Sequence, residues 1–295
     1  MASDLRHTLG KTGYQVFPVA YGGIVSMKDG QTPSDGYVSW AIDHGVNYFD
    51  VAPSYQDAEE KLGNSLRPYR KDVYLACKTN CRLKKDAEVE LARSLKLLHT
   101  DWFDTYQLHG LASVEEVETA FGPGGVMELM VRAKEQGLTR CLGITCHSEK
   151  AALRAIELYD FDSVLFPFNW HMNLGHGMGS QLIRVAKEKN MGVLAMKQLI
   201  ERAWTDGDDA MRARFPKSWC KPIDPENVAL RLAAIKYTLS LGPDILIPPG
   251  DFENFSFVVE HIRECLENPL TEADLAFLKE NLARVQAHPF FPVEE

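Results

Sequence analysis

Four side chains with chemically useful groups stand at, or just after, the ends of three consecutive apolar runs. The run at 46–49, VNYF, ends in Asp50, and Tyr55 follows five residues later in a loop that contains proline and serine. Lys78 ends the next apolar run, and His109 ends the one after it. A buried strand has no use for an unpaired carboxylate, so Asp50 requires a cationic partner.

Together these groups could move a proton to or from a substrate oxygen. A phenol, with an ordinary pKa of about 10, becomes a usable acid at neutral pH when a cation lies beside it. Two unit charges about 4 Å apart interact by roughly 4 kcal/mol at an effective dielectric of about 20, which equals about three pKa units. We therefore expect Lys78 to lower the pKa of Tyr55, by less than this because Asp50 cancels part of the charge. Asp50 would hold Lys78 charged, and His109 would orient the substrate oxygen by a hydrogen bond.

A purely structural interpretation also exists for these residues. Lys78 and Asp50 could form a plain salt bridge, and His109 could be a hydrogen-bonded structural histidine. The coincidence of all four residue types on three consecutive strand ends favours the catalytic interpretation.

Short apolar runs typical of β-strands alternate with amphipathic helical stretches along almost the whole chain. The predicted strands are 16–23, 46–52, 72–79, 103–110, 139–145, 161–169, 192–198 and 244–250. The predicted helices are 33–44, 57–66, 86–98, 125–136, 148–159, 180–190, 225–241, 252–267 and 271–286. Ser148 and Ser180 stand at the front of two of these helices, and serine is a favourable N-cap residue. The stretch 171–179 is expected to be a loop.

Eight strands, each followed by a helix, predict an α/β fold of the (β/α)₈ TIM barrel type, with residues 1–295 as one domain. The strands are continuous apolar runs, as expected for parallel strands covered on both faces. A doubly wound open sheet is the alternative, but the first strand–helix turn contains no GxGxxG. We expect an N-terminal β-hairpin at 1–15, against the barrel floor, and a C-terminal helical tail at 271–295. The irregular segment 199–224 is expected to form a long loop near the site.

Composition excludes several classes of protein. The net charge is −9, from 32 basic and 41 acidic residues, which argues against binding to nucleic acid or to an anionic membrane surface. No apolar run approaches the roughly 20 residues of a membrane span, and the N-terminus lacks the apolar core of a signal peptide. The six cysteines are sparse and show no CxxC spacing, so we expect reduced thiols and a cytoplasmic protein.

The sequence resembles the aldo/keto reductase superfamily from TLGKTG, in the expected hairpin, to IPPG at the last strand. The most specific segments are NYFDVAPSY, LACKT, DTYQLHG and GIT. The resemblance implies a barrel without a metal or a Rossmann domain, in which Asp50, Tyr55, Lys78 and His109 form a catalytic tetrad. It also implies an NAD(P)H-dependent enzyme that reduces a small aldehyde or ketone to the alcohol, with Tyr55 as general acid.

The resemblance also implies residues that would contact the cofactor. Thr145 matches the residue that holds the nicotinamide carboxamide, whereas the usual strand-six glutamine is replaced by Leu165. Met196 occupies the position of the aromatic residue that stacks on the nicotinamide ring, where its sulfur could replace that contact. The full predicted set is Gly22, Thr145, Cys146, Asn169, Met196, Lys197, Gln198, Gly250, Asp251 and Glu260.

The segment after the last strand bears on the choice of cofactor. Relatives that prefer NADP carry a basic run there, whereas residues 249–261 of this chain include Asp251 and Glu253 and no lysine or arginine. Acidic groups oppose a 2′-phosphate and can instead accept from a ribose hydroxyl, so we expect a preference for NAD. Alternatively, Asp251 simply caps the next helix, which leaves the cofactor choice open.

Other functions remain as alternatives or are disfavoured. A cofactor-sensing or regulatory barrel with weak or no turnover would account for the altered nicotinamide contacts, whereas an isomerase or lyase would require phosphate-binding or metal-binding residues that are not found. The tail contains one cysteine, Cys265, so no iron–sulfur cluster is expected, and His171 and His176 lack further ligands for a metal. Loops 21–32 and 199–224, with Trp170, Trp204 and Trp219, are candidate substrate walls. Substrate identity, reaction direction and oligomeric state stay open.

Overall fold

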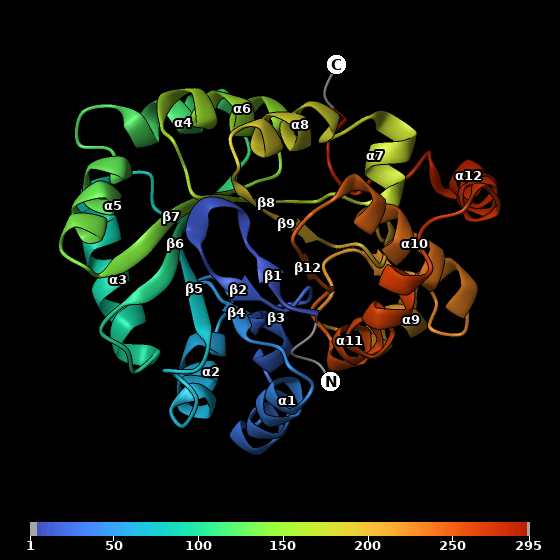
Figure 1. Ribbon diagram of the computed structural model, residues 1–295, viewed down its shortest axis with the longest axis horizontal. Coiled ribbons are helices and arrows are strands. Elements are labelled where there is room, and N and C mark those ends of the chain that lie inside the picture. Colours follow the sequence, from blue (N-terminus) through green and yellow to red (C-terminus); the bar gives the residue numbers. More distant parts are fainter. Residues whose placement is uncertain (1–4, 294–295) are drawn as a thin grey trace.

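The structure, a computed structural model, describes residues 5–293. Residues 1–4 of the predicted hairpin and residues 294–295 of the predicted tail lie outside the described residues. Figure 1 shows a central ring of strands with helices around it.

Eight parallel strands form the central sheet, in the order β12-β9-β8-β7-β6-β5-β4-β3. The sheet closes because Val19, just before β3, pairs with Leu246 in β12, and the Leu246 amide donates to the Pro18 carbonyl at 2.9 Å. The strands are β3 (Tyr21–Gly22), β4 (Tyr48–Asp50), β5 (Tyr74–Thr79), β6 (Phe103–Leu111), β7 (Thr139–Cys146), β8 (Ser163–Phe166), β9 (Gly192–Met196) and β12 (Ile245–Ile247). The predicted (β/α)₈ barrel is confirmed.

The first predicted strand, 16–23, is divided in the structure. Gln15–Val16 forms β2, which pairs antiparallel with β1 (His7–Thr8), and only Tyr21–Gly22 joins the barrel as β3. Pro18 lies between the two pieces, and proline cannot donate a hydrogen bond to a strand ladder. One apolar run therefore contributes both to the hairpin and to the barrel.

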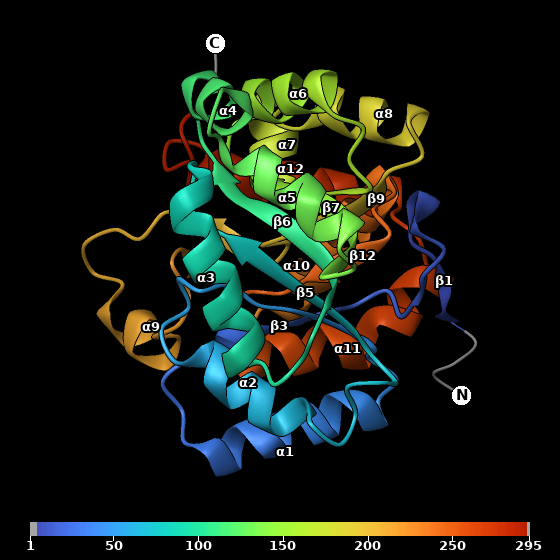
Figure 2. The ribbon, with the colours of Figure 1, turned by 90° about the vertical axis from the view of Figure 1, so that its left-hand side faces the viewer.

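Helices cover the outside of the barrel, and Figure 2 shows α3 and α5 in front of β5, β6 and β7. Their bounds are α1 (Gln31–Asp43), α2 (Ala58–Leu66), α3 (Lys84–Leu97), α4 (Val114–Phe121), α5 (Val126–Glu135), α6 (Glu149–Leu158), α7 (Trp170–His176), α8 (Ser180–Glu188), α10 (Val228–Leu241), α11 (Phe252–Glu267) and α12 (Glu272–Val285). The Ser148 side chain caps α6 by accepting from the Ala151 amide, as predicted. The predicted loop 171–179 is wrong in its first part, because Asn169 caps α7 there. The N-cap of α8 is Gly179 rather than Ser180.

The N-terminal hairpin packs against the end of the barrel opposite the strand ends that carry Asp50, Lys78 and His109. Leu9 and Tyr14 are buried in one cluster with Leu194 and Ile245 of the barrel strands. Gly10 has a φ of +45°, and a Cβ atom there would lie 2.2 Å from the Gly192 amide nitrogen. Only glycine allows the hairpin to approach this closely.

The segment 199–224 is more ordered than the predicted long loop. β10 (Ile200–Arg202) and β11 (Lys221–Pro222) pair antiparallel, and the short helix α9 (Asp209–Arg214) lies between them. The Arg202 guanidinium binds the Asp208 carboxylate at 2.7 Å, which fixes the turn before α9. Within residues 5–293 the structure contains no helix whose length and apolar content would let it span a membrane.

Candidate active site

An ion pair between Asp50 and Lys78 forms the base of the candidate site. Both residues are almost fully buried, at 2% and 1% exposure, and the Lys78 ammonium donates to Asp50 Oδ2. It also donates to the Val51 carbonyl at 3.2 Å, and Gln107 Nε2 donates to Asp50 Oδ1 at 3.2 Å. Burial alone lowers the pKa of Lys78, but the Asp50 and Tyr55 groups beside it raise that pKa by more, so the lysine stays charged.

The Tyr55 ring lies above this ion pair. The Lys78 ammonium is 5.1 Å from the centroid of the Tyr55 ring. The pKa of Tyr55 is nevertheless raised, because burial of the phenol outweighs the lowering by Lys78 and because Asp50 also raises it. The expectation that Lys78 produces a net lowering is therefore wrong, and the Tyr55 hydroxyl carries its proton at neutral pH.

His109 stands edge-on to Tyr55, with the ring centroids 5.8 Å apart. Its Nδ1 lies 2.7 Å from Asn80 Oδ1, which can only accept, so the His109 proton sits on Nδ1 and Nε2 keeps a lone pair. The Asn80 amide is oriented by Glu90, which accepts from the Asn80 backbone N–H at 2.9 Å and from Nδ2 at 3.4 Å. Burial and the Lys78 charge lower the pKa of His109 to about 2, so the ring is neutral.

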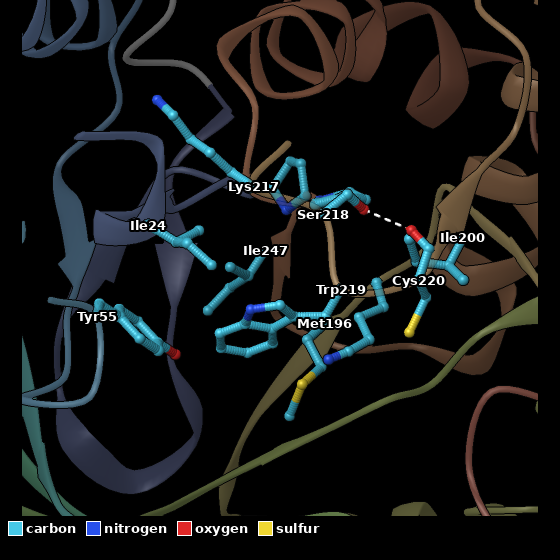
Figure 3. A pocket seen from close by; sticks show the side chains of 13 residues that line it. Ile24, Tyr55, Met196, Ile200, Lys217, Ser218, Trp219, Cys220 and Ile247 are labelled. Carbon is cyan, nitrogen blue, oxygen red and sulfur yellow. Dashed lines mark hydrogen bonds between the residues drawn. The ribbon is translucent and has the colours of Figure 1, made fainter. Parts of the chain in front are cut away.

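A pocket opens directly beside Tyr55 (Figure 3). Apolar side chains make most of its wall, and two lysines add positive charge. Trp219 is half-exposed and its ring centroid lies 5.8 Å from that of Tyr55. The lining residues are Ile24, Tyr55, Met196, Lys197, Ile200, Lys217, Ser218, Trp219, Cys220, Ile247, Pro248, Pro249 and Gly250. Flat apolar walls next to cationic groups fit a nicotinamide dinucleotide, which combines planar rings with anionic phosphates.

Only some of the predicted cofactor residues line this pocket. Met196, Lys197 and Gly250 do. Gly22 packs close by, since a Cβ atom there would lie 3.3 Å from an Ile247 methyl group. Gln198 is fully buried, and neither amide atom has a hydrogen-bond partner among residues 5–293.

Three other predicted cofactor residues make contacts within the protein. The Thr145 hydroxyl accepts from the Gly110 amide at 2.7 Å. The Cys146 side chain is fully buried in the main apolar core. The Asn169 amide donates to the Lys197 and Ile200 carbonyls at 2.7 and 2.9 Å.

Glu260 and Asp251 also lie outside the pocket wall. Glu260 borders a separate depression with Phe17 and His44. Asp251 is buried at the N-cap position of α11, but its side chain makes no capping hydrogen bond within the described chain. Burial raises the pKa of Asp251 to about 6, so this carboxyl is mostly ionised at pH 7 and gains its proton at mildly acidic pH.

Basic side chains from other parts of the chain lie close to the segment after β12. Arg214 binds Glu253 at 2.6 Å, and Arg231 donates to Asn254 Oδ1 at 3.2 Å. Lys217 is close enough to Asp251 to lower the pKa of that carboxyl. The expected preference for NAD rested on the lack of basic residues in 249–261, and these contacts remove its basis.

Sequence reasoning missed several residues of the site. Loops 21–32 and 199–224 were expected to form pocket walls, but the individual residues Ile24, Lys217, Ser218 and Cys220 that line the pocket were not identified, because these segments lack strand or helix periodicity. Asn80 stands two residues after Lys78, and this proximity was the one signal that could have identified it.

Two of the three candidate wall tryptophans lie elsewhere. Trp170 is fully buried between α10 and α12, and the Trp204 indole donates to the Ser218 carbonyl at 3.0 Å. Within residues 5–293, no group of three His, Cys, Asp or Glu side chains is arranged to hold a metal ion.

Comparison with known proteins identifies the class to which this barrel and its site belong. The family model of the aldo/keto reductase family matches residues 34–237, most of the barrel. The chain belongs to the aldo/keto reductase family, whose members are oxidoreductases that use nicotinamide cofactors.

Individual relatives agree with this assignment. The chain is 32% identical, over 122 residues, to the aldo-keto reductase YhdN of Bacillus subtilis; the match covers 36% of this chain and 34% of YhdN. The chain thus spans less than half the length of the curated relatives it matches.

Two solved structures share the fold over nearly their whole length. The aldo-keto reductase AKR11C1 from Bacillus halodurans, in its holo form, has a TM-score of 0.72 at 18% identity, covering 98% of this chain and 99% of that one. An aldo-keto reductase from Klebsiella pneumoniae in complex with NADPH has a TM-score of 0.66 at 19% identity, covering 92% and 93%.

Proposed function

We propose that this protein reduces an aldehyde or ketone to an alcohol with NADH or NADPH, and that Tyr55 is the general acid. The observation that carries the proposal is that three functional groups lie next to one another. The Asp50 carboxylate binds the Lys78 ammonium, and this ammonium lies 5.1 Å from the Tyr55 ring centroid. Family membership supports the oxidoreductase class.

The cofactor would supply the hydride when bound, and the chain's own residues would control the proton. As negative charge develops on the carbonyl oxygen, the Tyr55 hydroxyl donates its proton to it. The Lys78 charge then stabilises the phenolate that remains, although burial disfavours it. Asp50 keeps Lys78 charged and in place. His109 is neutral with Nε2 unprotonated, so it accepts a hydrogen bond from a hydroxyl at this point, such as that of the alcohol.

Met196, Trp219 and Ile247 would hold a planar ring of the cofactor. The NADPH complex of the Klebsiella relative supports NADP as a cofactor of that protein. For this chain we propose that either dinucleotide binds, because Arg214, Lys217 and Arg231 lie around the segment after β12.

The test is a titration of the purified protein with NADH and NADPH, followed by a panel of aldehydes and ketones with the cofactor that binds. We expect saturable binding, and oxidation of the cofactor in step with loss of the carbonyl compound. Binding without turnover on any carbonyl compound would instead favour a cofactor-sensing or regulatory barrel. Absence of binding to either nucleotide would contradict both functions.

A further inference from the structure

Lys197 occupies a backbone position that costs free energy to maintain. Its φ is +66°, in the left-handed region that favours glycine. Hydrogen bonds hold it there: its amide donates to the Ile247 carbonyl at 3.1 Å, and its own carbonyl accepts from Asn169 Nδ2 at 2.7 Å and from the Ile200 amide at 2.9 Å. Strain that neighbouring bonds maintain in this way is concentrated at functional sites.

The Lys197 side chain places its ammonium between two aromatic rings at the pocket. The ammonium is 5.4 Å from the Trp219 ring centroid and 5.0 Å from that of Phe291. Within residues 5–293 the structure gives it no hydrogen bond or ion pair. The other pocket lysine, Lys217, differs in this respect, because its ammonium donates to the Val25 carbonyl and to Asp29.

The positive charge of the Lys197 ammonium is therefore not balanced by an anion among the described residues. Burial lowers the pKa of Lys197, because water is removed from the charged form and no carboxylate replaces it. Attraction to the two ring faces compensates for less of this cost than a paired anion would. The remaining attraction is available to an anion that enters the pocket.

The surroundings also show which part of the pocket such an anion would occupy. Trp219, which contacts the Lys197 ammonium, also packs against the Tyr55 ring, and Phe291 stacks on His147 at 4.4 Å. The Lys197 ammonium is thus linked through Trp219 to Tyr55, the proposed proton donor. Figure 3 shows Tyr55 and Met196 on either side of Trp219.

We propose that Lys197 binds an oxyanion, a carboxylate or phosphate group, on a molecule that occupies this pocket. The proposal rests on the proposed function in naming the two molecules that would carry this group: an anionic carbonyl substrate, or the dinucleotide through its diphosphate. In the first case the substrate class is an oxo acid or a phosphorylated aldehyde.

The experiment compares the wild type with three variants. Lys197→Met removes the charge at nearly constant length, and Lys197→Arg retains it. Lys71→Met is the matched control, because Lys71 is an exposed lysine near the hairpin end of the barrel. Thermal melting confirms that each variant is folded. One assay measures the ratio of kcat/KM for 4-carboxybenzaldehyde to that for benzaldehyde at saturating cofactor. A second measures the dissociation constants of NADH and NADPH.

We expect Lys197→Met to lower the kcat/KM ratio or the nucleotide affinity at least tenfold, the size of a charged hydrogen bond. Lys197→Arg should restore most of the loss, and Lys71→Met should show none. A fall in the ratio alone assigns the oxyanion to the substrate, and a fall in nucleotide affinity alone assigns it to the diphosphate. Changes below tenfold in both assays would overturn the proposal.

Failure of the proposed function would be recognised separately. If the wild type neither binds nucleotide nor reduces an aldehyde, calorimetric titration with inorganic pyrophosphate and with benzoate still tests Lys197. Binding of either probe that weakens at least tenfold in Lys197→Met supports the oxyanion site. A smaller change, or no binding to the wild type, contradicts it.

Discussion

Two lysines at the carboxyl ends of barrel strands differ in their surroundings. Lys78, at the end of β5, is fully buried and bound to Asp50 beneath the Tyr55 ring. Lys197, just after β9, lies against two aromatic rings in the pocket and has no carboxylate partner among the described residues. The first charge is balanced by the protein itself, whereas the second is balanced only when an anion enters. Whether a lysine has a carboxylate partner in the protein therefore indicates whether it acts on a neighbouring side chain or binds a ligand.

The largest effect is expected from breaking the paired site. Lys78→Met leaves the Asp50 carboxylate buried without its cation, which should lower the free energy of unfolding by roughly 3–5 kcal/mol and abolish turnover. Chemical denaturation measures the change in stability. Lys61→Met is the control, because the Lys61–Asp57 pair is partly exposed and should contribute under about 1 kcal/mol. A loss at Lys78 no larger than at Lys61 would show that the buried pair is not structurally important.

The next largest effect concerns the proton donor above Lys78. Tyr55→Phe removes the hydroxyl but keeps the ring, so turnover should fall at least about a hundredfold, the typical size of general acid catalysis. The dissociation constants of NADH and NADPH should stay within about twofold of the wild type, since the phenylalanine ring still fills the pocket wall. Steady-state kinetics and nucleotide titration make the measurement. Tyr159→Phe, on the helical outer layer, serves as the control, and normal turnover in Tyr55→Phe would remove Tyr55 from its assigned role.

The unpaired lysine predicts a change of opposite sign in stability. In the absence of ligand, Lys197→Met should raise the free energy of unfolding by about 0.5–2 kcal/mol, because the variant no longer holds an unpaired charge in a partly buried position. The pKa of Lys197 is lowered in the folded state, so the unfolded chain binds more protons between that pKa and about 10.4. The advantage of the variant should therefore shrink as the pH rises through this range. Destabilisation in place of stabilisation would mean that Lys197 is part of the structural core.

The last effect is confined to acidic pH and concerns the neutral His147 beside Lys197. Burial, together with the Lys197 charge, lowers the pKa of His147 to about 3. Below an unfolded-state pKa of about 6.5, the unfolded chain binds a proton there that the folded chain does not, so stability falls as the pH decreases. His147→Asn should reduce this loss by at most about 1.4 kcal/mol per pH unit between pH 6.5 and 5. Chemical denaturation at several pH values measures how the free energy of unfolding depends on pH, with exposed His44→Asn as the control. The same pH dependence in the wild type and in His147→Asn would contradict the lowered pKa of His147.

Much of the site could be predicted because of how the barrel is built. Asp50, Lys78 and His109 end neighbouring parallel strands, and the carboxyl ends of such strands converge at one face. Their convergence therefore follows from strand order alone, without knowledge of side-chain packing. The same reasoning gave Lys197 at the end of a later strand, whereas Met196 came from the family resemblance.

The other wall of the pocket could not be predicted in this way. Lys217 and Trp219 lie in a segment without periodicity, and it is tertiary contacts, such as the bond from Lys217 to Asp29 and the Trp204 bond to Ser218, that place them. The sign of the pKa shift of Tyr55 was also out of reach. It depends on the balance between burial and the Lys78 charge, and burial is known only once the fold is known.

The most direct test of the account is the transfer of label from deuterated cofactor. NADH or NADPH deuterated at the transferable position of the nicotinamide is incubated with benzaldehyde and the wild type, Tyr55→Phe or Lys78→Met, and the alcohol is analysed by mass spectrometry. We expect one deuterium on the carbinol carbon with the wild type, and formation of this alcohol at least about a hundredfold more slowly by both variants. Unlabelled alcohol or no alcohol from the wild type, or equal rates in the three proteins, would contradict the account.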